Sequence, residues 1–148
     1  AVDDLSSFKR IVDGAAHDAA MVCGMAEDPS IDYLKAGAVG FSSGMANFVP
    51  RMSVELLRAF CSGDLEEAER LRGEMVPFED LRGEDGARYS TSALHAAMDY
   101  AGLAGGPVIP FAEPVAEADL ARLYEMMSRL LEQEERLREV SHVAEQAS

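Results

Sequence analysis

Residues 35–78 read KAGAVGFSSGMANFVPRMSVELLRAFCSGDLEEAERLRGEMVPF and predict a short strand followed by two amphipathic helices. The strand is the apolar run Val39–Ser43, which turn-forming glycines bound on both sides. Ser42 and Ser43 therefore fall at the carboxyl end of a predicted strand, where α/β folds place ligand contacts. Their hydroxyl groups either contact a ligand or satisfy neighbouring backbone groups, and the sequence favours neither.

The two helices after this strand have recognisable ends. Pro50–Ser62 begins with a proline, which suits the first helical turn, and Gly63 can end the helix in the left-handed conformation. Asp64 and Glu67 form an acidic variant of a capping box for the next helix. The economical interpretation is a pair of antiparallel helices joined by a very short turn.

A second strand precedes this region. Ala19–Cys23 is a short apolar run that suits a strand buried on both faces, although five residues also fit a turn of helix. Ser6–Val12 predicts a helix before it, and Asp28-Pro29 predicts the start of a helix between the two strands. Two parallel strands alone leave two bare edges and little core. Either further strands come from another part of the polypeptide, or the domain is all-helical.

The remaining sequence is helical with two interruptions. Residues 82–86 are a turn-rich break, and Ser90–Ala101 predicts a helix. Gly105–Pro110 is expected to be an extended connector, because proline lacks a backbone donor and disfavours helix before it. Glu117–Val143 predicts a long surface helix whose glutamates and arginines form a solvated face.

Charge and composition narrow the partners. The 148 residues carry 27 acidic and 13 basic side chains, a formal net charge of −14, which argues against nucleic acid or membrane partners. Cys23 and Cys61 lack metal or disulfide spacing and are expected to be reduced core residues. No apolar run approaches a membrane span and the first residues do not resemble a signal peptide, so a cytoplasmic location is the default expectation.

A search for a self-contained active site finds little. His17, His95 and His142 show no pairing at metal-ligand spacing, so no metal site is expected. Four carboxylates lie near the predicted strand ends without acid–base spacing, and helix capping is the preferred role for each of them: Asp3, Asp4, Glu27 and Asp28.

Three segments together resemble a known enzyme family. They are CGMAEDPSIDYLKAGAVGFSSGMANFVP at 23–50, SGDLEEAERL at 62–71 and HAAMDYAGLAGGPVIPF at 95–111. In this order they are similar to the C-terminal half of the dihydrodipicolinate synthase and N-acetylneuraminate lyase family. The resemblance implies an α/β fold, the last two strands of a (β/α)8 TIM barrel within residues 1–80, and a C-terminal helical extension within residues 81–148.

The resemblance also implies a chemistry. Members form a Schiff base between a lysine on the sixth barrel strand and pyruvate or another 2-oxo acid, which prepares the substrate for aldol cleavage, condensation or dehydration. That lysine is expected just upstream of residue 1, and the proton-relaying tyrosine lies on an earlier strand. We therefore expect no catalytic residue within these 148 residues, which by themselves are expected to be inactive and poorly folded.

Substrate-binding positions are carried over residue by residue. The resemblance places Gly24 beside the substrate pocket, and Ser42 and Ser43 where the backbone contacts the bound oxo acid. The family's usual acidic residue after this glycine is replaced by Met25, in a loop one residue longer, which favours a divergent lyase, aldolase or dehydratase. No cofactor is implied.

The partners that the resemblance implies are the 2-oxo acid, the N-terminal half of the barrel and further copies in a homo-oligomer, expected to be a homotetramer. The rival hypothesis is a small non-enzymatic helical interaction domain. It differs in strand content, because only a barrel segment requires Ala19–Cys23 and Val39–Ser43 to be adjacent parallel strands.

Overall fold

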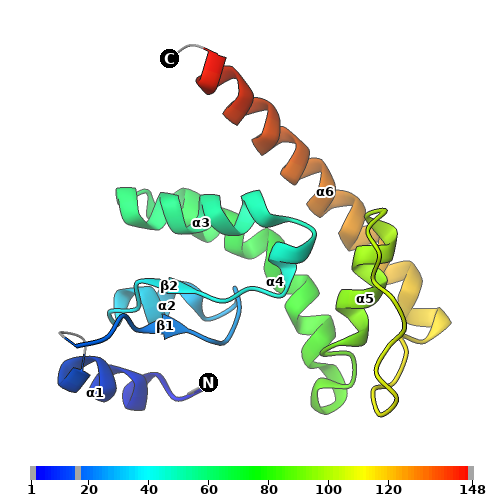
Figure 1. The fold of residues 1–148 in the computed structure, drawn as a ribbon, viewed down its shortest axis with the longest axis horizontal. Helices are drawn as coiled ribbons and strands as arrows, with labels where there is room; N and C mark the ends of the chain where they lie inside the picture. The colour runs from blue at the N-terminus through cyan, green and yellow to red at the C-terminus, as the bar shows by residue number, and fades with distance from the viewer. Residues whose placement is uncertain (1–2, 16–17, 147–148) are drawn as a thin grey trace.

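The computed structural model describes residues 3–15 and 18–146, and side chains as far as residue 140. Two short strands lie among helices, and the last helix packs against α3, α4 and α5 and extends beyond them (Figure 1). The elements are α1 (Leu5–Ala15), β1 (Val22–Cys23), α2 (Ser30–Lys35), β2 (Gly40–Phe41), the 3-10 turn η1 (Met45–Asn47), α3 (Pro50–Ser62), α4 (Leu65–Ala87), α5 (Ser92–Tyr100) and α6 (Glu117–Gln146).

The two strands pair in parallel, with Val22 opposite Gly40. Helix α2 makes the crossover between them, as a parallel pair requires. The ladder continues beyond the assigned strands, because the Val39 amide donates to the Met21 carbonyl at 2.8 Å and the Ser42 amide to the Cys23 carbonyl at 2.8 Å. The strands are shorter than predicted, but their parallel pairing excludes an all-helical domain.

The prediction that Ala19–Cys23 is buried on both faces is wrong. Cys23 is fully buried, whereas Val22 is 51% exposed. Ala19 lies outside the strand and is exposed. Helices cover only the face that carries Cys23, which packs in a small core with Phe8 of α1 and Tyr33 of α2. The described residues leave the opposite face of the sheet uncovered. Successive residues of β1 point to opposite faces, so they differ in burial.

The first two helices differ in how they begin. Asp4 caps α1 as predicted, because its carboxylate accepts hydrogen bonds from the amides of Ser6 and Ser7. Hydrogen bonds from these two serines lower the Asp4 pKa from 3.8 to about 2. Asp28 does not cap α2, contrary to prediction. Its carboxylate instead pairs with Arg72 of α4 at 3.2 Å, because α4 lies close to the start of α2.

Helices α3 and α4 are joined as predicted. Gly63 ends α3 at a φ of 84°, and the Asp64 carboxylate accepts from the Glu67 amide at 3.1 Å. The expected burial of Cys61 is wrong, since this thiol is exposed. The buried face of α3 is made by Met52, Ser53, Leu56 and Ala59, and Cys61 falls outside it.

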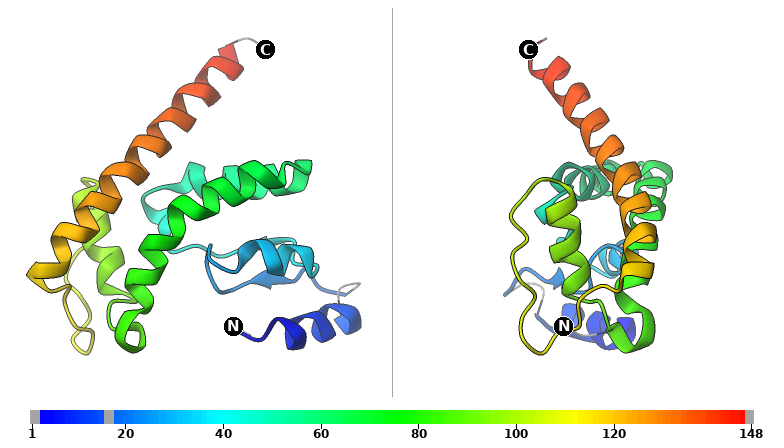
Figure 2. Two further views of the ribbon diagram at one scale, coloured as in Figure 1. Left: turned by 180° about the vertical axis from the view of Figure 1, so that it is seen from behind. Right: turned by 90° about the vertical axis from the view of Figure 1, so that its right-hand side faces the viewer.

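Helix α4 keeps its helical backbone as far as the predicted break. It runs through Pro77, which removes one helical hydrogen bond, and its ribbon bends along its length (Figure 2). The predicted break appears at Glu84–Gly86, where the backbone leaves the helical region. The division at residue 80 lies inside α4, with Phe78 and Leu81 both in the main core, and that division stays a prediction.

The main core lies among η1 and helices α3 to α6. Helix α6 contributes Leu123, Met127 and Leu130, and its C-terminal part extends away from the other helices (Figures 1 and 2). Not all of its glutamates are solvated. Glu134 is buried and accepts hydrogen bonds from the amides of Arg51 and Met52 at 3.0 Å each, so α6 caps α3 from 82–83 residues away.

Candidate functional site

The carboxyl ends of β1 and β2 meet at one edge of the sheet. Gly24 follows β1 and Ser42 follows β2, and the hydrogen bond from the Ser42 amide to the Cys23 carbonyl holds the two exits together. Both residues are exposed. The structure thus brings these two predicted site residues to the same sheet edge, where ligand sites of α/β folds lie.

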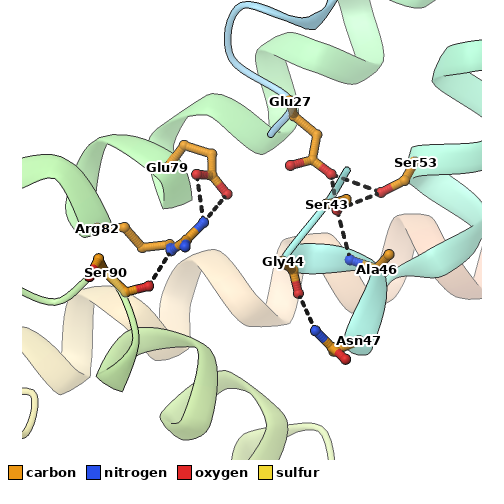
Figure 3. A network of polar contacts seen from close by, with 9 residues as sticks. All are labelled: Glu27, Ser43, Gly44, Ala46, Asn47, Ser53, Glu79, Arg82 and Ser90. Carbon is orange, nitrogen blue, oxygen red and sulfur yellow. Dashed lines mark hydrogen bonds and ion pairs between the residues drawn. The ribbon is translucent and has the colours of Figure 1, made fainter. Parts of the chain in front are cut away.

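Ser43 is partly buried among the helices, and its hydroxyl group is occupied by protein contacts. The Ser43 hydroxyl donates to the Glu27 carboxylate and accepts from the Ala46 amide at 2.9 Å (Figure 3). The Ser53 hydroxyl of α3 donates to the same Glu27 oxygen at 2.9 Å. The hydroxyl of Ser43 therefore has a structural role, and the predicted contact of its backbone with an oxo acid stays a prediction.

The predicted capping role of Glu27 is wrong. Its side chain is fully buried, with Oε1 bound to two serines and Oε2 without a hydrogen-bond partner among the described residues. Burial is the main cause that raises the Glu27 pKa above 4.5, and the nearby charge of Glu79 raises it further, while the serine hydrogen bonds oppose the shift. A buried, partly unsatisfied carboxyl group is typical of functional sites.

One signal in the sequence points toward this arrangement. The resembled family has an acidic residue directly after the glycine, where this chain has Met25, and Glu27 is the next acidic residue in a loop that is one residue longer. Spacing alone could not show that Glu27 reaches Ser53, because those residues are 26 positions apart and meet only after α3 packs over the strand exit.

An arginine from α4 lies on the other side of the β2 exit. Arg82 pairs with Glu79 at 2.7 Å and donates to the Ser90 carbonyl at 2.9 Å (Figure 3). A Cβ atom at Gly44 would lie 3.0 Å from the Leu94 side chain and 3.4 Å from Arg82. The chain leaving β2 therefore passes closely between α4 and α5, and a side chain at position 44 would have to displace the tips of Leu94 and Arg82 by a few tenths of an ångström.

A cavity of about 670 Å³ lies beside the loop that follows β1, and Met25 contributes to its wall. Every charged residue that lines it is acidic: Asp3, Asp28, Glu79, Asp80 and Glu84. Gly24, Ser42 and Ser43 do not line it. This negative lining opposes binding of an anionic oxo acid, so the candidate site remains the open sheet edge at Gly24 and Ser42.

Among the histidines, only the side chain of His95 is described, and it contacts the connector after α5. His95 lies on α5 with Nδ1 3.2 Å from the Gly106 carbonyl oxygen, while His17 and the side chain of His142 are outside the described residues. Within residues 3–15 and 18–140, no group of three His, Cys, Asp or Glu side chains is arranged to hold a metal ion. In the part of the chain that the structure describes, no helix has the length and apolar character needed to cross a bilayer.

Comparison with known proteins adds independent observations. The chain is 40% identical over 77 residues to a probable 5-dehydro-4-deoxyglucarate dehydratase of Xanthobacter autotrophicus, covering 51% of this chain and 25% of that protein. It is 32% identical over 106 residues to a protein of the same description from Saccharopolyspora erythraea, covering 71% of this chain and 34% of that protein.

The fold has a solved counterpart. Dihydrodipicolinate synthase from Oceanobacillus iheyensis superposes with a TM-score of 0.81 at 30% identity, over 87% of this chain and 44% of that one. The chain thus spans less than half the length of these relatives. A family model described as the dihydrodipicolinate synthetase family matches residues 1–133. The match extends over most of the sequence and agrees with the fold, so the chain belongs to the dihydrodipicolinate synthetase family.

Proposed function

We propose that this chain is the C-terminal part of a lyase that forms a lysine Schiff base with a 2-oxo acid. The observation that carries the proposal is the parallel pair β1–β2, whose carboxyl ends present Gly24 and Ser42 on an open face, within a chain of this family. A (β/α)8 barrel places its substrate at the carboxyl ends of its strands. The remaining strands would then cover the face on which Val22 is exposed.

The chemistry divides between this chain and the rest of the barrel. A lysine outside residues 1–148 supplies the amine that condenses with the substrate carbonyl, with loss of water, and the resulting iminium withdraws electrons from the neighbouring carbon. The sheet edge in this chain contributes a binding surface. Gly24 allows a substrate to approach the backbone closely, and Ser42 presents a hydroxyl and a carbonyl oxygen beside it.

Dehydration is the reaction that we favour within this class. Two relatives described above are probable 5-dehydro-4-deoxyglucarate dehydratases, and this chain has Met25 where the family pattern has an acidic residue. A dehydratase substrate of that kind is a hydroxylated 2-oxo acid, which loses a hydroxyl group as water after the Schiff base forms. Consumption of 5-dehydro-4-deoxyglucarate, measured against pyruvate-dependent condensation, separates a dehydratase from a synthase.

The test of the Schiff base is reductive trapping. The protein at its native length is incubated with pyruvate or 5-dehydro-4-deoxyglucarate, reduced with borohydride and weighed by intact-mass spectrometry. We expect a mass increase equal to one oxo acid minus one water plus two hydrogens, which peptide mapping places on a lysine. A control sample without borohydride should show no stable adduct. If no 2-oxo acid gives an adduct, the proposed function is wrong.

A further inference from the structure

Glu27 has an unusual environment for a carboxyl group. It is fully buried, and no ion pair among the described residues includes it. A buried carboxyl group without a cation destabilises the folded state, because the hydrogen bonds that it accepts only partly replace its hydration. Its Oε2 atom also has no hydrogen-bond partner in the part of the chain that the structure describes. Stability alone therefore does not account for a glutamate at this position.

Three segments of the chain meet at this carboxyl group. Glu27 belongs to the loop after β1, Ser43 to the exit of β2 and Ser53 to the first turns of α3. Ser43 also accepts the Ala46 amide and so holds the start of η1 (Figure 3). One carboxylate oxygen thereby fixes the direction in which the chain leaves β2.

The β2 exit is restrained on its two sides by different contacts: Gly44 packs closely against Leu94 and Arg82, whereas Glu27 holds Ser43 on the side of the β1 loop. The sheet pairing ends with the hydrogen bond from the Ser42 amide to the Cys23 carbonyl, and β2 itself is two residues long. Beyond that point the side-chain link between the β1 loop and the β2 exit is Glu27 to Ser43. Since Ser42 precedes Ser43 directly and is exposed, the link that holds Ser43 also sets the position of Ser42.

We infer that Glu27 is a positioning residue that acts through the Ser43 hydroxyl to hold Ser42 against the bound oxo acid. This inference rests on the proposed function, because it assigns Glu27 a role in the same site. Glu27 does not touch the substrate. Its effect is geometric, and small displacements of a substrate-contacting group weaken binding strongly.

The experiment measures how much pyruvate is needed for half-maximal borohydride trapping by the protein at its native length. Glu27→Ala and Ser43→Ala should each raise this concentration roughly tenfold, because either change breaks the same link. The double variant should be no worse than the single variants, as expected for two residues that act as one unit. Glu27→Gln keeps an oxygen that accepts both serine hydroxyls and should stay within about threefold of wild type.

The matched control is Glu134→Ala. Glu134 is also buried and hydrogen-bonded, but its hydrogen bonds among the described residues go to Arg51 and Met52 at the start of α3 and not to Glu27 or Ser43. This variant should lower the Tm without changing the half-saturating pyruvate concentration. If Glu27→Ala does not fold, Ser43→Ala and Glu27→Gln still carry the comparison.

The outcomes separate the two proposals. If wild type forms an adduct and Glu27→Ala and Ser43→Ala both keep the half-saturating pyruvate concentration of wild type, the positioning role is wrong and the proposed Schiff base is not affected. Additive effects in the double variant, or an equal effect of Glu134→Ala, overturn it as well. Absence of any adduct in wild type overturns both the proposed function and this inference.

Discussion

Glu27 and Glu134 are the two buried glutamates among the described side chains, and they differ in how their charge is balanced. Glu134 accepts two backbone amides at the start of α3 and pairs with Arg51 at 3.2 Å. Glu27 accepts hydrogen bonds from two serine hydroxyls, has no ion-pair partner among the described residues and has the charge of Glu79 nearby. The same side chain is therefore stabilising in one environment and costly in the other.

The raised pKa of Glu27 predicts a pH dependence of stability. An acid whose pKa is raised by folding binds its proton more tightly in the folded state. The contribution of this bound proton to the stability of the fold is fully present below the ordinary pKa of 4.5. It is lost as the pH rises through the raised pKa of the folded state. Glu27→Gln cannot ionise, so the Tm of wild type should fall relative to that of the variant as the pH rises above 4.5 and through the raised pKa of Glu27.

Thermal melts of both proteins at several pH values check this prediction. The matched control is Glu125→Gln on α6, an exposed carboxylate that pairs with Arg129, where the difference from wild type should change little. A difference between wild type and Glu27→Gln that is the same at every pH contradicts ionisation of a buried Glu27.

Residues with local partners were predictable, and residues with distant partners were not. Asp4 and Asp64 cap helices through amides two or three positions away, so their roles follow from spacing. The position of Glu27 just before a predicted helix start favours a capping role, but its hydrogen-bond partners lie 16 and 26 positions away along the chain. Cys61 was expected in the core, and a small rotation of the buried stripe on α3 exposes it.

Two glycines in neighbouring helices give a paired prediction at the scale of the element. Gly63 ends α3 at a φ of 84°, whereas Gly73 lies inside α4, and a Cβ atom at either site would meet no atom within 4 Å. Gly63→Ala should destabilise by about 1 kcal/mol, because only its backbone conformation resists a side chain. Gly73→Ala should stabilise by about 0.5–1 kcal/mol through helix propensity.

Denaturant unfolding of the two variants measures this difference directly. Because neither alanine creates a clash, the two signs isolate backbone conformation from packing. The two changes in the free energy of unfolding need not be equal in magnitude. A stabilising Gly63→Ala would contradict the left-handed end of α3. An unchanged or destabilised Gly73→Ala would contradict the helical interior of α4.

The helices were predicted better than the strands. Capping and hydrophobic spacing located α3, the start of α4 and α6 closely, because those signals repeat over several turns. The two predicted strands are at the correct places but are longer than the observed ones. The prediction also places β1 between two covered faces, whereas only one of its faces is buried. A run of five apolar residues carries no information about which face is covered, since that depends on elements elsewhere in the chain.

The whole molecule has two hydrophobic cores of unequal size. The larger is built on η1 and α3 to α6, and the smaller joins α1, β1 and α2, with Phe41 and Phe60 packed against both. The sheet has one open face, on which Val22 is exposed. The helical part should therefore be the more stable part of residues 1–148.

Hydrogen exchange followed by mass spectrometry tests this at the scale of the molecule. In a polypeptide of residues 1–148, peptides covering 21–42 should exchange at least about tenfold faster than peptides covering 50–81. In the protein at its native length, the remaining barrel strands would cover the open face of the sheet. The difference in exchange rate between the two sets of peptides should then become smaller. Equal protection of both regions in residues 1–148 would contradict the unequal cores.

The sequence by itself determined the helix ends, the order of strands and helices, and the candidate positions Gly24 and Ser42, because each depends on residues that are near in the chain. Only the tertiary structure decided that Ser43 points into the protein toward Glu27 and that Glu134 caps a distant helix. These contacts join segments that meet only when helices pack over the sheet. Their free energy depends on burial and geometry, and neither is written in local spacing.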